Sequence, residues 1–300
     1  MIPLSQIREF GNIELLARQL VEGFITGLHK SPYHGFSVEF AEHRLYNNGE
    51  STRHIDWKVY AKTDRLYTKR YEEETNLRCQ LVVDNSSSMY YPEENKGKIT
   101  FSTMAAAALA FLLQKQRDAV GLTIFSEDIE QQTPVKSTSS HTHKLLLILE
   151  ELLREQSASR KTSVASVLHQ IAEKIHKRSL VVIFSDMFEN QDKTEPLFSA
   201  LKHLKHNRHE VLLFHVTDHK TELNFDFEER PYEFIDIESG EKLKLQPSQV
   251  RETYRKRMQE YYHDLKIRCG QAKIDFIEAD INQGFHQILR SYLVKRASMS

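Results

Sequence analysis

Residues 77–89 read LRCQLVVDNSSSM, an apolar run that ends in an acidic residue and a group of serines. The apolar, β-branched part of this run predicts a strand that is buried on both faces. Beyond Asp84 the short polar side chains favour a turn or a helix N-cap, because they hydrogen-bond nearby backbone groups. An Ala- and Leu-rich segment at 99–113 then has helical spacing. We therefore expect a strand-to-helix junction here, which is where open α/β sheets bind ligands.

Asp84, Ser86 and Ser88 have the spacing D-x-S-x-S, which a tight turn can point toward one centre. One carboxylate and two hydroxyls are hard oxygen donors, and they suit Mg²⁺ or Mn²⁺ rather than soft metals. Mg²⁺ prefers six ligands and rarely takes all of them from one protein, so a position would remain for water or an incoming carboxylate. The alternative is a serine-rich turn that only caps the next helix, and this short pattern alone does not separate the two.

Two later residues extend the set. Thr162 stands at the start of a segment with helical spacing and is a good N-cap residue. Asp186 ends an apolar strand predicted at 179–185, just as Asp84 ends the first strand. If the two strands are parallel neighbours, the side chains converge at one edge of the sheet. The sequence thus predicts a metal site made of Asp84, Ser86, Ser88, Thr162 and Asp186.

This set of five resembles the metal-ion-dependent adhesion site of von Willebrand factor A domains, whose pattern is D-x-S-x-S, then a Thr, then an Asp. The resemblance implies that the two serines and Thr162 contact Mg²⁺ directly or through water, and that the two aspartates complete the shell. It also implies that a Glu or Asp of a partner protein takes the open position.

The chain beyond residue 77 alternates strands and helices. We expect strands at 119–125, 179–185, 210–216 and 274–279, with an antiparallel edge strand at 129–135. Together with the first strand they predict an α/β domain of the von Willebrand factor A-like (Rossmann-like) type. Its sheet is expected to be doubly wound, mostly parallel and six-stranded, with helices on both faces. We assign this domain to 77–300, with a β-hairpin excursion at 222–246.

Residues 1–76 are expected to form a small α+β elaboration that consists of an N-terminal helix and a β-rich region. Ile13–Leu28 has the apolar stripe of an amphipathic helix. In the region that follows, Ile55, Trp57 and Val59 alternate with polar residues up to a turn at Thr63 and Asp64. A period of two predicts short strands or a hairpin.

The same region resembles the signature of a bacterial family named domain of unknown function 58, in which Y-x-x-G, R-x-I-D-W-x-x-x-A-x-T and K-x-x-x-E-E precede the A domain. The matching residues are Tyr46, Gly49, Arg53, Ile55, Asp56, Trp57, Ala61, Thr63, Lys69, Glu73 and Glu74. The resemblance implies an adaptor or cofactor of a MoxR-type AAA+ ATPase. We interpret Arg53, Asp56, Trp57 and Glu73 as a packed, ion-paired scaffold rather than as a direct partner contact.

The composition of the chain limits the kinds of partner and the cellular compartment that we expect. The chain has 41 basic and 42 acidic residues, so its total charge does not point to nucleic acid or to an anionic membrane. Two cysteines do not make a disulfide framework, which favours a reducing compartment. The N-terminus lacks the pattern of a signal peptide, and we find no apolar run near the roughly 18 residues of a membrane span. We expect a cytoplasmic protein without membrane insertion.

Two functions follow from these patterns. The first is a metal-dependent protein-interaction module, in which Mg²⁺ bridges to an acidic residue of a partner. The second is a metal-assisted hydrolase, in which the same metal activates water for attack on a phosphate or an ester. The motifs G-x-S-x-G, G-x-x-x-x-G-K-[ST] and G-x-G-x-x-G are all missing. Because of the family resemblance and the absence of these catalytic motifs, we favour the interaction module over an enzyme.

Overall fold

The computed structural model describes residues 12–29, 43–45, 57–69, 77–154, 163–187, 194–236 and 240–299. By compactness the chain divides into two units, and each is considered by itself. The larger unit comprises Met1–Phe24 and Leu77–Ser300, and the smaller comprises Ile25–Asn76.

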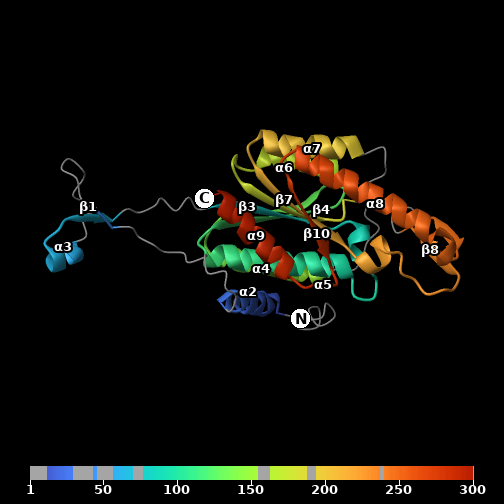
Figure 1. Ribbon diagram of the computed structural model, residues 1–300, viewed down its shortest axis with the longest axis horizontal. Helices are drawn as coiled ribbons and strands as arrows, with labels where there is room; N and C mark the ends of the chain where they lie inside the picture. The colour runs from blue at the N-terminus through green and yellow to red at the C-terminus, as the bar shows by residue number, and fades with distance from the viewer. Residues whose placement is uncertain are drawn as a thin grey trace. The chain divides into compact units, whose positions relative to one another are not determined.

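A six-stranded sheet forms the centre of the larger unit (Figure 1). Its strands are β3 (Arg78–Asp84), β4 (Ala119–Phe125), β5 (Ile129–Gln132), β6 (Leu180–Ser185), β7 (Glu210–Thr217) and β10 (Asp275–Asp280). They lie in the order β10-β7-β6-β3-β4-β5, and each neighbouring pair is parallel except β4 and β5. The predicted α/β class and the mostly parallel six-stranded sheet are thus confirmed.

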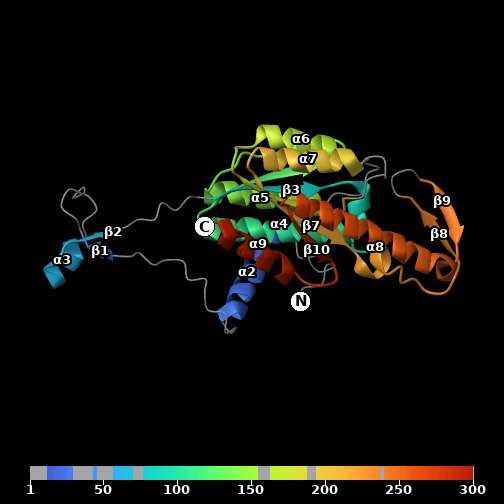
Figure 2. The same cartoon turned by 45° about the horizontal axis from the view of Figure 1, so that its top comes forward.

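Helices cover both faces of this sheet (Figure 2). They are α4 (Gly97–Lys115), α5 (Ser139–Arg154), α6 (Val164–Lys174), α7 (Thr194–His206), α8 (Pro247–Gln271) and α9 (His286–Met299). Helix α2 (Ile13–His29) contacts α9 instead, where the rings of Phe24 and His286 meet at 5.4 Å. Helices α6 and α7 and the C-terminal half of α8 bury the apolar side chains of one face, including Val82 and Ile183. On the other face α4 packs beside α9, where the rings of Phe101 and Phe285 stack at 4.8 Å.

Helix α4 is buried almost all round, and 16 of its 19 residues are buried. Among the described helices it is the one whose length and mean hydropathy would allow it to cross a membrane, and 89% of that apolar window is buried within the fold. The expectation that no segment reaches the length of a span is therefore corrected. A helix that is apolar on all sides is also typical of one that is packed against protein on several sides.

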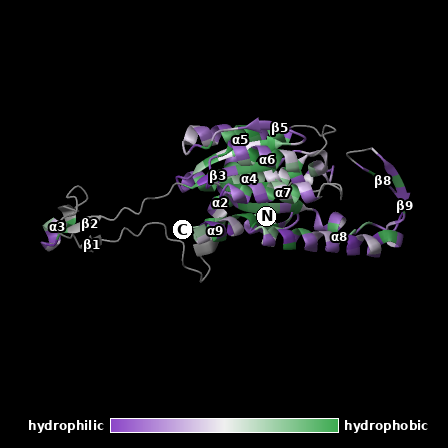
Figure 3. Cartoon of the chain, turned by 90° about the horizontal axis from the view of Figure 1, so that it is seen from above, coloured by the Kyte–Doolittle hydropathy of each residue, from purple (hydrophilic) through white to green (hydrophobic). Residues whose placement is uncertain are grey.

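The excursion after β7 starts with a π-helical turn, η4 (His219–Leu223), and continues into an antiparallel hairpin of β8 (Tyr232–Ile235) and β9 (Lys242–Leu245). The hairpin has an aromatic inner face, since the rings of Phe225 and Phe234 stack at 5.5 Å and Phe225 also meets Tyr254 of α8 at 4.5 Å. Figure 3 shows polar residues along much of α8. The charged side chains of α8 are therefore those of a helix at the surface.

The smaller unit pairs β1 (His43–Leu45) with β2 (Tyr67–Lys69) in antiparallel fashion, and it contains α3 (Trp57–Thr63). The prediction of strands through Trp57 and Val59 was wrong, because this segment is a helix. Trp57, Tyr60 and Ala61 also recur at helical spacing, and seven residues are too few for the period alone to separate the two. Of the signature residues, Tyr46, Gly49, Arg53, Ile55, Asp56, Glu73 and Glu74 lie outside the described residues.

We expect the central strand to carry a large part of the stability of the larger unit. Leu81 of β3 is completely buried, so Leu81→Ala should leave a cavity and lower the free energy of unfolding by about 3 kcal/mol. Leu243→Ala is the matched control, because Leu243 is 61% exposed and its loss should cost about 0.5 kcal/mol or less. Urea unfolding of both variants measures the two values, and equal costs would contradict this assignment of the core.

Candidate metal centre

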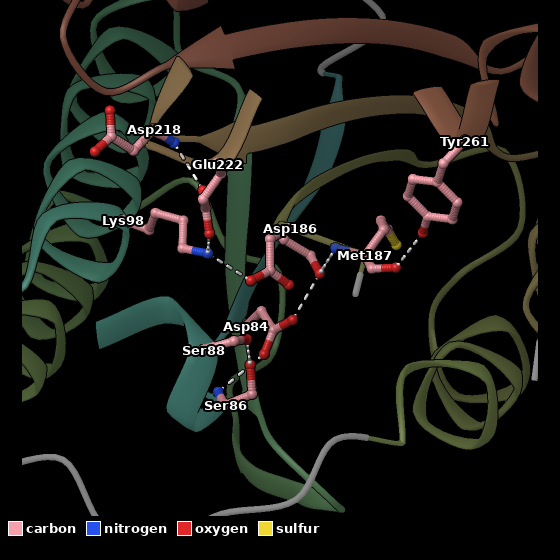
Figure 4. A network of polar contacts seen from close by, with 10 residues as sticks. Asp84, Ser86, Ser88, Lys98, Asp186, Met187, Asp218, Glu222 and Tyr261 are labelled. Atoms are coloured by element: carbon pink, nitrogen blue, oxygen red, sulfur yellow. Dashed lines mark hydrogen bonds and ion pairs between the residues drawn. The ribbon is translucent and has the colours of Figure 1, made fainter. Parts of the chain in front are cut away.

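Four of the five predicted metal ligands meet at the carboxyl edge of the sheet. Strands β3 and β6 are parallel neighbours with Val83 opposite Phe184, so the turns that follow them start side by side. Figure 4 shows the carboxylates of Asp84 and Asp186 next to each other, with the two serines close to Asp84. Thr162 lies outside the described residues.

Asp84 shapes the turn that carries the serines. It is fully buried, and its Oδ1 accepts a hydrogen bond from the backbone N–H of Ser86 at 2.9 Å. This bond closes a turn over two residues and brings the hydroxyl oxygens of Ser86 and Ser88 within 3.1 Å of each other. The Oδ2 atom of Asp84 accepts from the Ser185 hydroxyl at 2.6 Å, which ties β3 to the end of β6.

The turn after β6 is fixed from two directions. The backbone N–H of Met187 donates to the Ser185 hydroxyl at 2.9 Å, and the Tyr261 hydroxyl of α8 donates to the Met187 carbonyl at 2.8 Å. Met187 has a φ of 51°, in the left-handed region that residues other than glycine seldom adopt. The two hydrogen bonds stabilise this costly backbone conformation directly after Asp186.

The electrostatics of the centre favour a cation. Burial raises the pKa of Asp84, and the negative charge of Asp186 raises it further, against the opposing effect of the hydrogen bonds from Ser185 and Ser86. Two buried carboxylates in each other's field are costly unless positive charge lies between or beside them. Their oxygens and the paired serine hydroxyls are hard donors, so the residues present fit Mg²⁺ or Mn²⁺.

A buried lysine that the sequence reasoning missed lies beside these carboxylates. Lys98 is the second residue of α4, and its Nζ donates to Asp186 Oδ2 at 2.8 Å and to Glu222 Oε1 at 2.5 Å. Glu222 comes from η4, and its Oε2 accepts from the backbone N–H of Asp218 at 2.8 Å. The one feature of the sequence that could have indicated a buried lysine is its position at the start of an otherwise apolar helix.

His215 is a second buried group that the sequence did not reveal. It lies directly opposite Ser185 in the pairing of β6 with β7, and its ring meets that of Tyr262 edge-on at 4.8 Å. Within the described part of the chain neither ring nitrogen has a hydrogen-bond partner. Burial lowers the pKa of His215 to about 4, although the negative charge of Asp186 acts in the opposite direction. The imidazole is therefore neutral at pH 7.

This histidine should make the fold sensitive to acid. Because its pKa is near 6.5 when unfolded and about 4 when folded, the unfolded chain binds the proton more tightly between these values. The contribution of His215 to the free energy of unfolding is then complete above pH 6.5. It falls as the pH drops toward 4, by about 2 kcal/mol between pH 7.5 and 5. We expect His215→Phe to remove this loss, since the phenyl ring does not titrate. Urea unfolding at both pH values measures it.

The control for this prediction is His206→Phe, because His206 is exposed on α7. It should keep the pH dependence of the wild type. An unchanged pH dependence in His215→Phe would show that other groups dominate the acid response.

Comparisons with known proteins place the chain in a family. Residues 42–264, about three quarters of the chain, match the family described as "Protein of unknown function DUF58". The uncharacterized proteins Mb1516 of Mycobacterium bovis and Rv1480 of Mycobacterium tuberculosis are 27% identical over 206 residues, which are 69% of this chain and 63% of theirs. The chain thus spans less than two thirds of the length of these relatives.

Two solved structures from Bacteroides are similar to the fold. The conserved hypothetical protein BatB of B. thetaiotaomicron has a TM-score of 0.47 at 14% identity, covering 75% of this chain and 100% of that one. An aerotolerance-related membrane protein of B. fragilis has a TM-score of 0.48 at 13% identity, covering 73% and 99%. By the extent of the family match, this chain belongs to the DUF58 family of proteins of unknown function.

Proposed function

We propose that this protein is a divalent-metal-dependent protein-interaction module with a von Willebrand factor A-like domain. Asp84, Ser86, Ser88 and Asp186, together with Thr162, would hold Mg²⁺ or Mn²⁺. The observation that carries the proposal is the convergence of Asp84 and Asp186, with the serine hydroxyls beside them, at the carboxyl edge of adjacent parallel strands.

Each residue of this centre has a separate task. Asp84 and Asp186 supply the buried negative charge that attracts a cation. Ser86 and Ser88 supply neutral oxygens, which leave the cation poor in electrons and so receptive to a further anionic ligand. Ser185 does not need to touch the metal, because its hydroxyl orients Asp84.

A bound divalent cation would supply a bridge to a carboxylate that the partner presents. The contacts around the centre support binding rather than catalysis. Asp84 accepts from Ser86 and Ser185, and the ammonium of Lys98 engages both Asp186 and Glu222. Hydrolysis would require a general base placed to deprotonate a metal-bound water, and Asp84 and Asp186 would themselves serve as ligands of the metal.

The partner that we propose is a MoxR-type AAA+ ATPase or one of its clients, with this protein acting as adaptor or cofactor. The support is the resemblance of the N-terminal region to the family signature, whose residues Trp57, Ala61 and Thr63 lie on α3. We propose further that the protein acts in the cytoplasm, without membrane insertion.

Calorimetric titration of Mg²⁺, and then of Mn²⁺, into the chelator-treated protein tests the metal site. We expect saturable binding at one site in the wild type and none in Asp84→Ala, because the variant loses a buried charge that attracts the cation. Asp275→Asn is the matched control and should bind as the wild type does, since Asp275 begins β10 at the opposite edge of the sheet. Equal binding by wild type and Asp84→Ala would refute the assignment.

A pull-down with a purified MoxR-type ATPase tests the bridge. We expect capture in the presence of Mg²⁺, loss of capture in excess chelator, and no capture by Asp84→Ala. A complex that is equally strong in excess chelator would contradict a metal-bridged contact. Turnover of generic phosphate or ester substrates that is lost in Asp84→Ala would instead favour the hydrolase.

A further inference from the structure

Two histidines face each other across the contact between α6 and α7. His169 lies in the middle of α6, and His203 lies in the last turn of α7. Their Nδ1 atoms are 3.0 Å apart, and the centres of their rings are 5.2 Å apart with a tilt of 44° between the planes. Neither residue belongs to the candidate metal centre.

The packing of the two helices fixes the backbone that carries this pair. Helices α6 and α7 lie side by side (Figures 1 and 2). Leu168 precedes His169 and Leu204 follows His203, and both leucines are completely buried in one apolar cluster. The two histidines themselves are half-buried. A ligand of both imidazoles would therefore meet side chains that already project from ordered positions, which lowers the cost of binding.

The separation of the two nitrogens fits a shared metal ion. An imidazole nitrogen binds Zn²⁺ at about 2.0–2.1 Å, so two of them on one ion lie roughly 2.8 to 3.4 Å apart for bond angles between about 90° and about 110°. The distance of 3.0 Å falls within this range. A proton between the two nitrogens lets one donate and the other accept, whereas a metal ion engages the lone pairs of both.

We propose that His169 and His203 form a second metal site, which binds a transition-metal ion such as Zn²⁺, Ni²⁺ or Cu²⁺ through both Nδ1 atoms and so links α6 to α7. Imidazole suits these ions, whereas the oxygen donors around Asp84 suit Mg²⁺ or Mn²⁺. Within the described ranges no group of three or more histidines, cysteines and carboxylates could hold an ion. Water or an external ligand therefore completes the coordination.

Four variants of the full chain test this site. His169→Gln and His203→Gln each remove one imidazole and keep a polar side chain. His206→Gln is the matched control, because His206 is exposed and lies one turn from His203 on the same helix. Asp84→Ala keeps the histidine pair and removes a carboxylate of the candidate metal centre. Urea unfolding of each variant checks that it is folded.

Two probes measure binding. Calorimetry follows Ni²⁺ in the presence of excess Mg²⁺, and electron paramagnetic resonance of one equivalent of Cu²⁺ reports the nitrogens bound to the ion. Ni²⁺ affinity should fall about tenfold or more in His169→Gln and in His203→Gln, since even the loss of a group that only orients a ligand costs about that much. The Cu²⁺ spectrum should show two coupled nitrogens in the wild type and one in each of these variants. His206→Gln and Asp84→Ala should match the wild type.

Three results would overturn the inference. The first is no Ni²⁺ binding by the wild type, and the second is equal affinity in the wild type, His169→Gln and His203→Gln, which would leave the pair as a hydrogen bond alone. The third is a similar loss in His206→Gln, which would place the ion on the exposed face of α7. Failure of Mg²⁺ binding with Ni²⁺ binding retained would refute the function proposed above and leave this site standing.

Discussion

The parallel pairing of β3 with β6 is the constraint on which the rest of the site depends. It places the buried ends of two strands side by side, with Asp84 at the end of β3 and Asp186 directly after β6. Two carboxylates held this close inside a protein repel each other, and water cannot screen them. The surrounding hydroxyls, backbone N–H groups and Lys98 all donate toward this negative charge. The site is therefore organised by a surplus of buried negative charge more than by any single contact.

Much of this arrangement could be predicted from sequence because it is local or repetitive. The apolar runs that end at Asp84 and Asp186 give the strands and their polar ends, and the alternation of strands with helices gives the parallel sheet. Since side chains that follow parallel strands lie at the same edge, the meeting of the two aspartates was predicted on the condition that the two strands are neighbours, and the pairing of β3 with β6 meets that condition. The D-x-S-x-S spacing is local as well, so the sequence alone predicts a turn that points these side chains toward one centre.

The parts that could not be predicted depend on contacts between distant positions. Lys98 meets Asp186 across 88 residues and Glu222 across 124, and nothing in the local pattern of either acidic residue indicates a buried ammonium. His215 lies between apolar residues of its strand, and its lack of a hydrogen-bond partner among the described residues depends on its packing against Tyr262 of α8. The segment Trp57–Thr63 fits both the period of a helix and that of a strand. Its seven residues alone therefore do not determine that a helix forms there.

The near-complete burial of α4 has a mechanical consequence. A helix enclosed by close-packed side chains cannot tilt or slide without opening voids on several sides, so its N-terminus is a fixed reference point. The ammonium of Lys98 is anchored to that point, whereas none of the residues of η4 is buried. We therefore expect a change of charge at the edge of the sheet to move the less buried η4 more readily than α4. Because Glu222 of η4 contacts the ammonium of Lys98, such a movement would reach the loop that leads to the β8–β9 hairpin.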